Sequence, residues 1–422
     1  MNVTVEGGTK LYGSVEVSGA KNSATRILAA SMLAEGEVVI TNFPLTLEDV
    51  KAKINFMTSI GSVVEGFSEE SILKVTTNEL SYKDVLDYDV PIRTTYLLSA
   101  APLARNSYAR VPYPGGCKIG SRGYDMHVMV WKCMGCSVEE KADFIEITGS
   151  LKGAVIDFPI STIGGTENAL MCAAVASGTT IIKNAYVSPE VNDLIQFLRA
   201  MGSSIELEGT STIRVVGTSG LLKGTEYPVM PDRIEALTWI VLSAINGGHI
   251  EVKNVPYDIL EIPLIHLRES GVDIFKSASN AIVSSSSVGK FGIQPFELAC
   301  GSYPGVISDM QAFFVLLAQF ASGRSIVYDY RYPERIAYAK ELNKFWPGSI
   351  SAESGKIVIV GQVDSQPAVV KSTDLRGSMA LLMAALCVSG TNKVEGVELA
   401  LRGYNNLQSK LKKIGAKCEW SK

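Results

Sequence analysis

A pattern that returns six times along the chain is the feature of this sequence that most constrains its fold. In each occurrence an amphipathic helical stretch is followed by an apolar residue, a glycine and a short strand-like run. The glycines lie about 70 residues apart, so the 422 residues divide into six units, marked by Gly61, Gly135, Gly202, Gly271, Gly348 and Gly415. An elongated solenoid is the weaker interpretation, because solenoid repeats usually have periods of about 20–50 residues.

A second marker recurs within the units, where a helix is followed by a small residue, a glycine and a β-branched strand. We expect these glycines to supply the left-handed conformation that ends a helix; they are Gly36, Gly178, Gly247 and Gly323. The preceding helices, such as 27–33, 236–245 and 379–388, are apolar nearly all round and therefore belong in a core. The other helix of a unit, such as 191–201, carries a polar stripe and is expected to cover the outside.

The length of the chain predicts two domains of three units each, since 422 residues exceed what one ordinary core holds. The expected architecture is α/β, with buried central helices wrapped by sheets and outer helices. A net charge of −4 gives no basic footprint, so nucleic acid is not an expected partner. The start of the chain lacks the pattern of a signal peptide, and no apolar run is long enough to span a bilayer.

Cysteine usage points to a reducing, cytoplasmic environment. Seven cysteines are scattered without framework spacing. Cys133 and Cys136 form one Cys-x-x-Cys pair, but the chain has three histidines and no second pair nearby, so a zinc site is not favoured.

Charged residues gather where the buried helices are expected to begin, near Lys21, Arg93, Thr166, Asp232, Asp309 and Asp374. Aspartates at such positions have an ordinary explanation as N-caps. Cations there oppose the helix dipole, which attracts anions instead. Lys21, Arg93, Arg233 and Arg376 therefore need a compensating anion, either a neighbouring aspartate or a bound phosphate or carboxylate.

The segment 112–122 combines prolines, glycines, one thiol and two cations. Its composition predicts a turn-rich surface loop. Cys117 lies close to Lys118 and Arg122, which should lower the pKa of the thiol and make it reactive. Cysteines inside apolar helices, such as Cys172 and Cys387, are interpreted as packing residues.

These segments resemble the bacterial UDP-N-acetylglucosamine enolpyruvyl transferases, which are members of the EPSP synthase family. The resemblance runs almost from end to end and is carried by the stretches 18–22, 114–120, 231–235, 308–311, 373–376 and 402–404. It implies two inside-out α/β barrel (prism) domains, each of three βαβαββ-type repeats, with the active site in the cleft between them. One domain would span 21–230, and the other would combine 1–20 with 231–422.

The resemblance also implies the reaction. The enolpyruvyl group of phosphoenolpyruvate would pass to a hydroxyl of UDP-N-acetylglucosamine with release of phosphate, the first committed step of peptidoglycan synthesis. Both substrates are small molecules, and no metal, cofactor, membrane or obligate protein partner is implied.

The resemblance assigns residues to roles in that reaction. Lys21, Arg122 and Arg402 would bind the phosphate, while Arg335 and Arg376 would orient the carboxylate. Cys117 would protonate carbon-3, and Asp309 would take the proton of the acceptor hydroxyl or orient it. The remaining substrate-binding residues implied are Asn22, Arg93, Asp125, Thr162, Ile163, Arg331 and Asp374.

Three departures from the family pattern leave the acceptor open. The stretch 123–127 reads Gly-Tyr-Asp-Met-His where the family has a proline first, Arg331 replaces an aliphatic nucleotide contact, and 345–349 departs from the usual Leu-Gly-Ala ending of a repeat. One alternative is a paralogue that uses a different nucleotide-type acceptor, and another is a non-catalytic binding or regulatory homologue. The sister enzyme of the shikimate pathway fits less well, because Lys21-Asn22 and Cys117 differ from its pattern.

Overall fold

The computed structural model describes residues 1–83, 85, 87–115, 123–284, 288, 289 and 291–422. Contacts divide the chain into two compact units. One, termed here the N-terminal unit, lies within 19–230, and the other, the C-terminal unit, combines 1–18 with 231–422. Each unit has its own hydrophobic core among the described residues, and no residue belongs to both cores.

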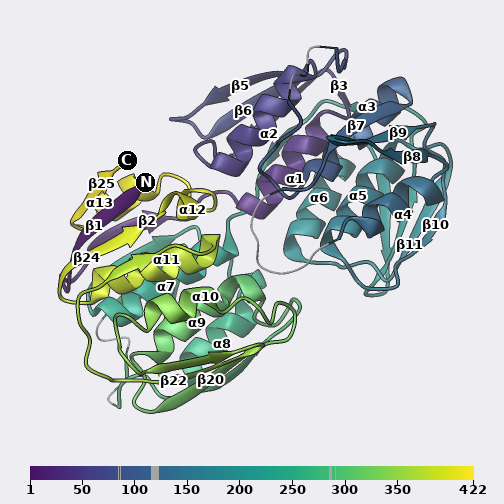
Figure 1. Cartoon of the computed structure of the whole chain (residues 1–422). Coiled ribbons are helices and arrows are strands. Elements are labelled where there is room, and N and C mark those ends of the chain that lie inside the picture. The colour runs from purple at the N-terminus through teal and green to yellow at the C-terminus, as the bar shows by residue number, and fades with distance from the viewer. Residues whose placement is uncertain (84, 86, 116–122, 285–287, 290) are drawn as a thin grey trace. The chain divides into compact units, whose positions relative to one another are not determined.

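The N-terminal unit alternates helices and strands along the chain (Figure 1). Its helices are α1 (Lys21–Ser31), α2 (Glu48–Ser59), η1 (Thr95–Leu98), α3 (Ala100–Asn106), α4 (Asp125–Cys133), α5 (Ile163–Val175) and α6 (Pro189–Ala200). Its strands are β3 (Ala34–Glu35), β4 (Glu37–Thr41), β5 (Val63–Phe67), β6 (Ile72–Thr76), β7 (Tyr108–Pro112), β8 (Ser137–Glu140), β9 (Phe144–Thr148), β10 (Val155–Asp157), β11 (Thr179–Lys183), β12 (Ser204–Glu208), β13 (Thr212–Val216), β14 (Leu222–Lys223) and β15 (Glu226–Pro228).

The C-terminal unit repeats this alternation. Its helices are α7 (Arg233–Asn246), η2 (Tyr257–Ile259), α8 (Glu261–Glu269), η4 (Ser308–Met310), α9 (Gln311–Ala318), α10 (Ala337–Leu342), α11 (Leu375–Cys387), α12 (Glu398–Leu401) and α13 (Leu407–Lys413). Its strands are β1 (Asn2–Gly7), β2 (Tyr12–Glu16), β16 (His249–Lys253), β17 (Phe275–Ser277), β18 (Asn280–Ser284), β19 (Glu297–Cys300), β20 (Arg324–Asp329), β21 (Ile350–Glu353), β22 (Lys356–Val360), β23 (Val369–Lys371), β24 (Gly390–Glu395) and β25 (Cys418–Ser421).

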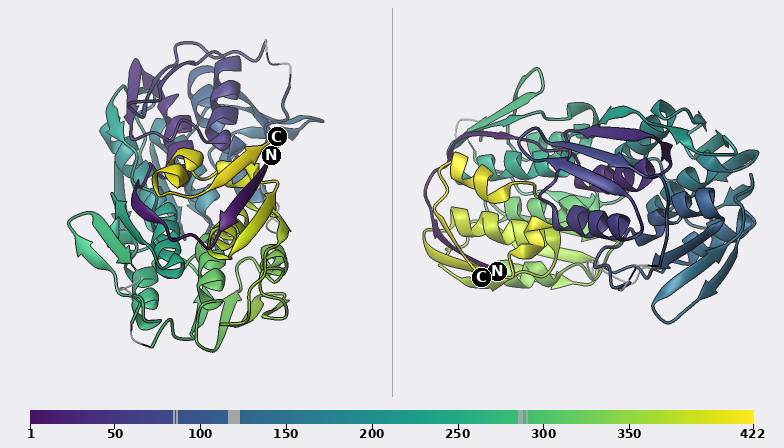
Figure 2. Two further views of the ribbon diagram at one scale, coloured as in Figure 1. Left: turned by 90° about the vertical axis from the view of Figure 1, so that its left-hand side faces the viewer. Right: turned by 90° about the horizontal axis from the view of Figure 1, so that it is seen from above.

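Five of the seven sheets in the described residues share one topology, which is the structural form of the sequence repeat; the other two are the antiparallel sheet β7-β9-β8 and the parallel pair β14-β3. In the described residues five sheets have four strands each, with one parallel pair at an edge and antiparallel pairs elsewhere; the orders are β10-β11-β13-β12, β15-β4-β6-β5, β17-β18-β16-β2, β19-β20-β22-β21 and β23-β24-β1-β25. The first strand of the chain completes the last of these sheets, since β1 pairs with both β24 and β25. The two termini therefore lie side by side on the C-terminal unit (Figure 2).

Buried helices form the centre of each unit, as the sequence predicts. Every residue of α5 from Gly165 onward is buried, as are all residues of α9 and nearly all of α7 and α11. On α6 the predicted polar stripe is exposed at Asn192, Gln196 and Arg199. The acidic residues at the start of that helix, Glu190 and Asp193, are instead buried.

The two sets of marker glycines behave differently. All six repeat glycines adopt positive φ, between 79° at Gly348 and 116° at Gly61. In the second set only Gly247 forms the predicted left-handed end of a helix. The prediction was wrong for the others, because α1, α5 and α9 end three to five residues before Gly36, Gly178 and Gly323, at Ser31, Val175 and Ala318.

The prediction of one helix that begins near Arg93 was also wrong. The chain forms η1 at Thr95–Leu98 and then α3 at Ala100–Asn106. Proline inside a helix removes a hydrogen bond and clashes with the carbonyl four residues earlier, which for Pro102 would be that of Leu98. Because α3 begins at Ala100, Pro102 falls in the first turn, where a missing N–H costs little.

Candidate active site

An ion-paired cluster stands at the helix starts of the C-terminal unit. Arg335 donates from Nη1 to Oδ1 of Asp309 at 2.9 Å and from Nη2 to Oδ1 of Asp374 at 2.8 Å. Its side chain is 3% exposed, so the guanidinium is almost fully removed from water. Burial lowers the pKa of Arg335, but Asp374 and Asp309 outweigh it and leave the pKa above its usual value. The arginine is therefore held permanently charged between two carboxylates.

Local structure fixes both carboxylates. Asp374 caps α11 by accepting from the backbone N–H groups of Arg376 at 3.1 Å and Gly377 at 3.2 Å. Asp309 lies in η4, directly before α9, and its side chain is 29% exposed. The N-cap interpretation thus holds for Asp374, and Asp309 is the member of the cluster that a ligand can reach.

Arg376 extends the cluster along the first turn of α11. Its Nε lies 3.5 Å from Oδ2 of Asp309, and its guanidinium lies over the ring of Tyr404, 5.3 Å from the centroid. Arg376 is 2% exposed, and its Nη1 is buried with no hydrogen-bond partner in the described part of the chain. Burial lowers the pKa of Arg376, but Tyr404, Asp309 and Asp232 outweigh burial and leave the pKa above its usual value. A buried guanidinium with an unmatched donor suits an anionic ligand.

Two further predicted site residues of this unit are Arg402 and Arg331. Arg402 is half-buried at the end of α12, two residues before Tyr404. Arg331 lies in the turn after β20; its backbone N–H donates to Asp329 at 3.0 Å, and its side chain is exposed.

A second charged group stands at the start of α1 in the N-terminal unit. Lys21 is the first residue of α1 and pairs through Nζ with Oδ2 of Asp49 on α2 at 2.9 Å. Asn22 follows it and is half-buried. The residue before the helix, Ala20, provides no side-chain cap. The compensating anion predicted for Lys21 thus includes a carboxylate of the protein.

Arg93, Asp125, Thr162 and Ile163 lie on three segments that meet around one aromatic pair. Arg93 donates from Nη2 to the carbonyl of Gly123 at 2.8 Å, and Asp125 begins α4 on the exposed side. Thr162 caps α5, and Ile163 is its first residue.

The aromatic pair consists of Tyr96 and His127, whose rings stack with centroids 3.4 Å apart. A Cβ at Gly164 would lie 2.5 Å from the Tyr96 hydroxyl, so only glycine lets α5 start this close. Burial, with a smaller contribution from Arg93, lowers the pKa of His127 to about 3. The imidazole is therefore neutral at ordinary pH.

Cys117 and Arg122 lie outside the described residues, as does Lys118. The residues that sequence reasoning missed include Asp49 and Lys53, one turn apart on α2, and Tyr404 beneath Arg376. The spacing of an acid and a base by four residues on α2 was visible, but such pairs are usually solvent-exposed.

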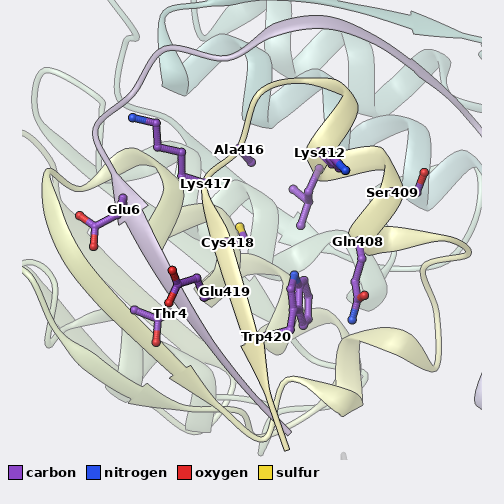
Figure 3. A pocket seen from close by; sticks show the side chains of 11 residues that line it. Thr4, Glu6, Gln408, Ser409, Lys412, Ala416, Lys417, Cys418, Glu419 and Trp420 are labelled. Carbon is purple, nitrogen blue, oxygen red and sulfur yellow. The ribbon is translucent and has the colours of Figure 1, made fainter.

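No group of three or more histidine, cysteine, aspartate or glutamate residues in the described part of the chain could hold a metal ion. No described helix is long and apolar enough to cross a membrane. A cavity of about 770 Å³ lies between β1, α13 and β25 of the C-terminal unit, lined among others by Glu6, Lys412, Lys417 and Trp420 (Figure 3). None of the predicted substrate-binding residues lines it.

Comparison with known proteins identifies the family to which the chain belongs. The family model for EPSP synthase (3-phosphoshikimate 1-carboxyvinyltransferase) matches residues 5–411. The chain belongs to the EPSP synthase family. Its fold class, two inside-out α/β domains built from repeats, is confirmed by two solved structures.

The enolpyruvyl transferase NikO from Streptomyces tendae superposes with a TM-score of 0.88 at 24% identity, covering 99% of this chain and 98% of that one. An EPSP synthase from Acinetobacter baumannii gives a TM-score of 0.77 at 19% identity and covers 100% of both chains.

Relatives within the family narrow the comparison. A UDP-N-acetylglucosamine 1-carboxyvinyltransferase of Campylobacter fetus subsp. fetus is 38% identical over 415 residues, 98% of this chain and 97% of that protein. The protein of the same name from Desulfovibrio desulfuricans is 36% identical over 417 residues, 98% of each. The predicted resemblance is therefore confirmed over nearly the whole length of the chain.

Proposed function

We propose that this protein transfers the enolpyruvyl group of phosphoenolpyruvate to a hydroxyl of UDP-N-acetylglucosamine and releases phosphate. The observation that carries the proposal is the likeness, over about 98% of both lengths, to proteins named for this reaction. The transfer would be the first committed step of peptidoglycan synthesis and would take place in the cytoplasm without metal, cofactor or obligate protein partner.

The charge of phosphoenolpyruvate explains why the helix starts hold cations. Its phosphate and carboxylate both suit guanidinium groups, which bind planar anions through paired hydrogen bonds. In the proposal Lys21, Arg122 and Arg402 bind the phosphate, and Arg335 and Arg376 orient the carboxylate. The buried, unmatched Nη1 of Arg376 supports that assignment, because a buried donor without a partner is unfavourable until an acceptor arrives.

The reaction needs one proton donor and one proton acceptor. Protonation of carbon-3 makes carbon-2 electrophilic, and the acceptor hydroxyl adds there while its proton passes to a base. A proton then leaves carbon-3 as the double bond reforms and phosphate departs. We assign the role of proton donor to Cys117, which lies outside the described residues. We assign the role of proton acceptor to Asp309. The exposure of Asp309 supports its role, since 29% of its side chain is accessible while its partner Arg335 is hidden.

The acceptor would contact the N-terminal unit through the segments that meet around Tyr96 and His127. Asn22, Arg93, Asp125, Thr162 and Ile163 carry this part of the proposal. Free N–H groups at the start of α5 suit the phosphates of a nucleotide. In the C-terminal unit Asp374 and Arg331 would complete the set.

A different nucleotide-type acceptor is the second candidate, and Arg331 favours it. An exposed guanidinium stands where the family has an aliphatic nucleotide contact. Such a cation suits an acceptor that carries extra negative charge at that point. A non-catalytic homologue would instead bind ligands without turnover.

Phosphate release from phosphoenolpyruvate separates these candidates in one assay. We expect release with UDP-N-acetylglucosamine and none with shikimate 3-phosphate. Release only with another nucleotide would favour the second candidate, and no release with any acceptor would contradict transferase activity altogether.

The assignment of Cys117 is tested in the same assay. Cys117→Ala should lower turnover about 10²–10⁴-fold, while Cys117→Asp, which can still donate a proton, should retain activity.

Alkylation followed by mass spectrometry gives an independent readout for Cys117. Burial raises the pKa of Cys136, Cys172, Cys300, Cys387 and Cys418, so these thiols should react slowly. Fosfomycin, an epoxide, should form its adduct on Cys117. An adduct on the exposed Cys133 instead would contradict the assignment.

A further inference from the structure

A lysine is fully buried within the N-terminal unit, beneath the segments that carry Lys21 and Arg93. Lys53 on α2 has no exposed surface. Its Nζ donates to the carbonyl of Thr25 at 2.7 Å and to the carbonyl of Thr94 at 3.2 Å. Burial of an amine costs free energy, so a lysine that stays inside needs a structural reason.

The two acceptors of Lys53 belong to the two segments that position the predicted cations. Thr25 lies one turn after Lys21 on α1, and its hydroxyl donates to the Lys21 carbonyl at 3.3 Å. Thr94 directly follows Arg93. One ammonium group or amine therefore joins the main chain of α1 to the main chain beside Arg93.

The same helix also holds the side chain of Lys21. Asp49, one turn before Lys53 on α2, pairs with Lys21 at 2.9 Å. Arg26 on α1 in turn pairs with Glu167 on α5 at 2.9 Å. The start of α1 is thus connected to α2 through both its backbone and its side chain, and to α5 one turn farther along.

The charges around Lys53 are nearly balanced in number. Burial lowers the pKa of Lys53 well below its usual value, Arg26 and Lys21 lower it further, and Glu167 and Asp49 oppose this. A neutral amine has two N–H donors, which is the number that the carbonyls of Thr25 and Thr94 accept.

We propose that Lys53 is a positioning residue, which sets the spacing between the Lys21 helix and the Arg93 segment by bridging the carbonyls of Thr25 and Thr94. Lys53 itself does not touch substrate; it acts through Lys21 and Arg93. The role in turnover rests on the proposed function, in which Lys21 binds the donor phosphate and Arg93 binds the acceptor.

Lys53→Met is the direct test, because methionine fills a similar volume without any N–H donor. Displacement of catalytic groups by about 1 Å costs on the order of 100-fold in rate. We expect kcat/KM to fall about 100-fold, with the KM of both phosphoenolpyruvate and the acceptor raised. Lys51→Met is the matched control on the same helix; Lys51 is 51% exposed and pairs only with Glu48 among the described residues, so kinetics should change less than about twofold.

Hydrogen–deuterium exchange tests the bridge without any substrate. In Lys53→Met, amides of α1 and of residues 94–98 should exchange faster, while those of α6 in the same unit keep their wild-type protection. A uniform rise throughout the unit, or wild-type kinetics in Lys53→Met, would overturn the proposal and leave Lys53 as an ordinary core residue. If the wild-type protein transfers no enolpyruvyl group, the proposed function fails, but the exchange experiment still decides the bridge.

A second variant covers the case in which Lys53→Met does not fold. Lys53→Gln keeps an N–H donor on a shorter side chain, so it should reach one carbonyl and show an intermediate loss of kcat/KM. Failure of both variants to fold would also overturn the proposal, since Lys53 would then act on global stability.

Discussion

The two units meet the same requirement, cations at buried helix starts, in opposite ways. In the C-terminal unit Arg335 and Arg376 are buried and paired with carboxylates that belong to the helix starts themselves, Asp309 and Asp374. In the N-terminal unit Lys21 is 17% exposed, α1 has no side-chain cap, and the pairing carboxylate comes from another helix. The C-terminal group is therefore a rigid, self-neutralised set, whereas the N-terminal group depends on packing against α2. Four predictions test this difference between the units, from the largest expected effect to the smallest.

Asp309→Asn should give the largest effect, because it removes the one accessible carboxylate of the self-neutralised set. We expect kcat to fall about 10²–10⁴-fold, as for loss of a general base, while the KM of phosphoenolpyruvate changes little. Steady-state kinetics measure both. The exposed Asp364→Asn in the same unit is the control, and equal losses in the two variants would contradict a specific role for Asp309.

Asp374→Ala should produce the largest loss of stability. It removes the partner of the buried Arg335 and the cap of α11 together. Breaking a buried ion pair from one side costs about 3–5 kcal/mol in the free energy of unfolding. Denaturant unfolding measures the change; a loss below about 1 kcal/mol would mean that Arg335 does not depend on this carboxylate.

Acid should destabilise the N-terminal unit through His127. Its pKa is about 3 in the folded protein and about 6.5 when unfolded, so the folded state binds fewer protons between these values. Its contribution to stability is complete above pH 6.5 and is lost as the pH falls towards 3. At pH 5 the loss is about 2 kcal/mol.

His127→Phe isolates this effect, because phenylalanine keeps a ring against Tyr96 but does not titrate. Unfolding free energies at pH 7.5 and pH 5 should differ by about 2 kcal/mol less in the variant than in the wild-type protein. An unchanged difference would contradict a buried, neutral imidazole. His249→Gln at an exposed position should leave the wild-type curve in place.

Tyr404→Phe should have the smallest effect. The variant keeps the ring beneath Arg376 and loses only the hydroxyl, which lies 2.9 Å from Oγ1 of Thr238. Thr238 still donates to the carbonyl of Ile234 at 2.8 Å, so the expected loss is about 1 kcal/mol. Thermal unfolding would measure this loss, and steady-state kinetics with phosphoenolpyruvate would show whether turnover changes. A loss of stability as large as that of Asp374→Ala would contradict the view that carboxylates hold the C-terminal cluster.

The sequence predicts the repeat and its buried helices because apolar periodicity and glycine spacing are local. It fails where neighbours decide. Gly36 and Gly247 follow similar apolar stretches, yet only Gly247 ends its helix, since α1 already stops at Ser31. Pro102 carried the information that the second helix is interrupted, although its effect depends on where the helix begins.

Some residues of the candidate site can likewise be predicted from the sequence, and others cannot. Charges at helix starts, such as Lys21 and Asp374, stand out because they break or satisfy a local rule. Lys53 does not, because a lysine on a polar stripe is ordinarily solvated and only the packing of α1 and η1 over it makes it buried. The roles of the predicted substrate-binding residues stay predictions until the assays above are done.

The pairing of β1 with β24 and β25 has a consequence for folding during synthesis. The ribosome releases β1 early, yet its partner strands β24 and β25, which end at Ser421, are made about 380 residues later. Among the described residues, every strand of the N-terminal unit has its partner strands once β15 has emerged, and domains commonly fold during translation. The edges of β1 therefore stay unpaired until β24 and β25 have emerged, and an unpaired strand edge is prone to pair with another chain.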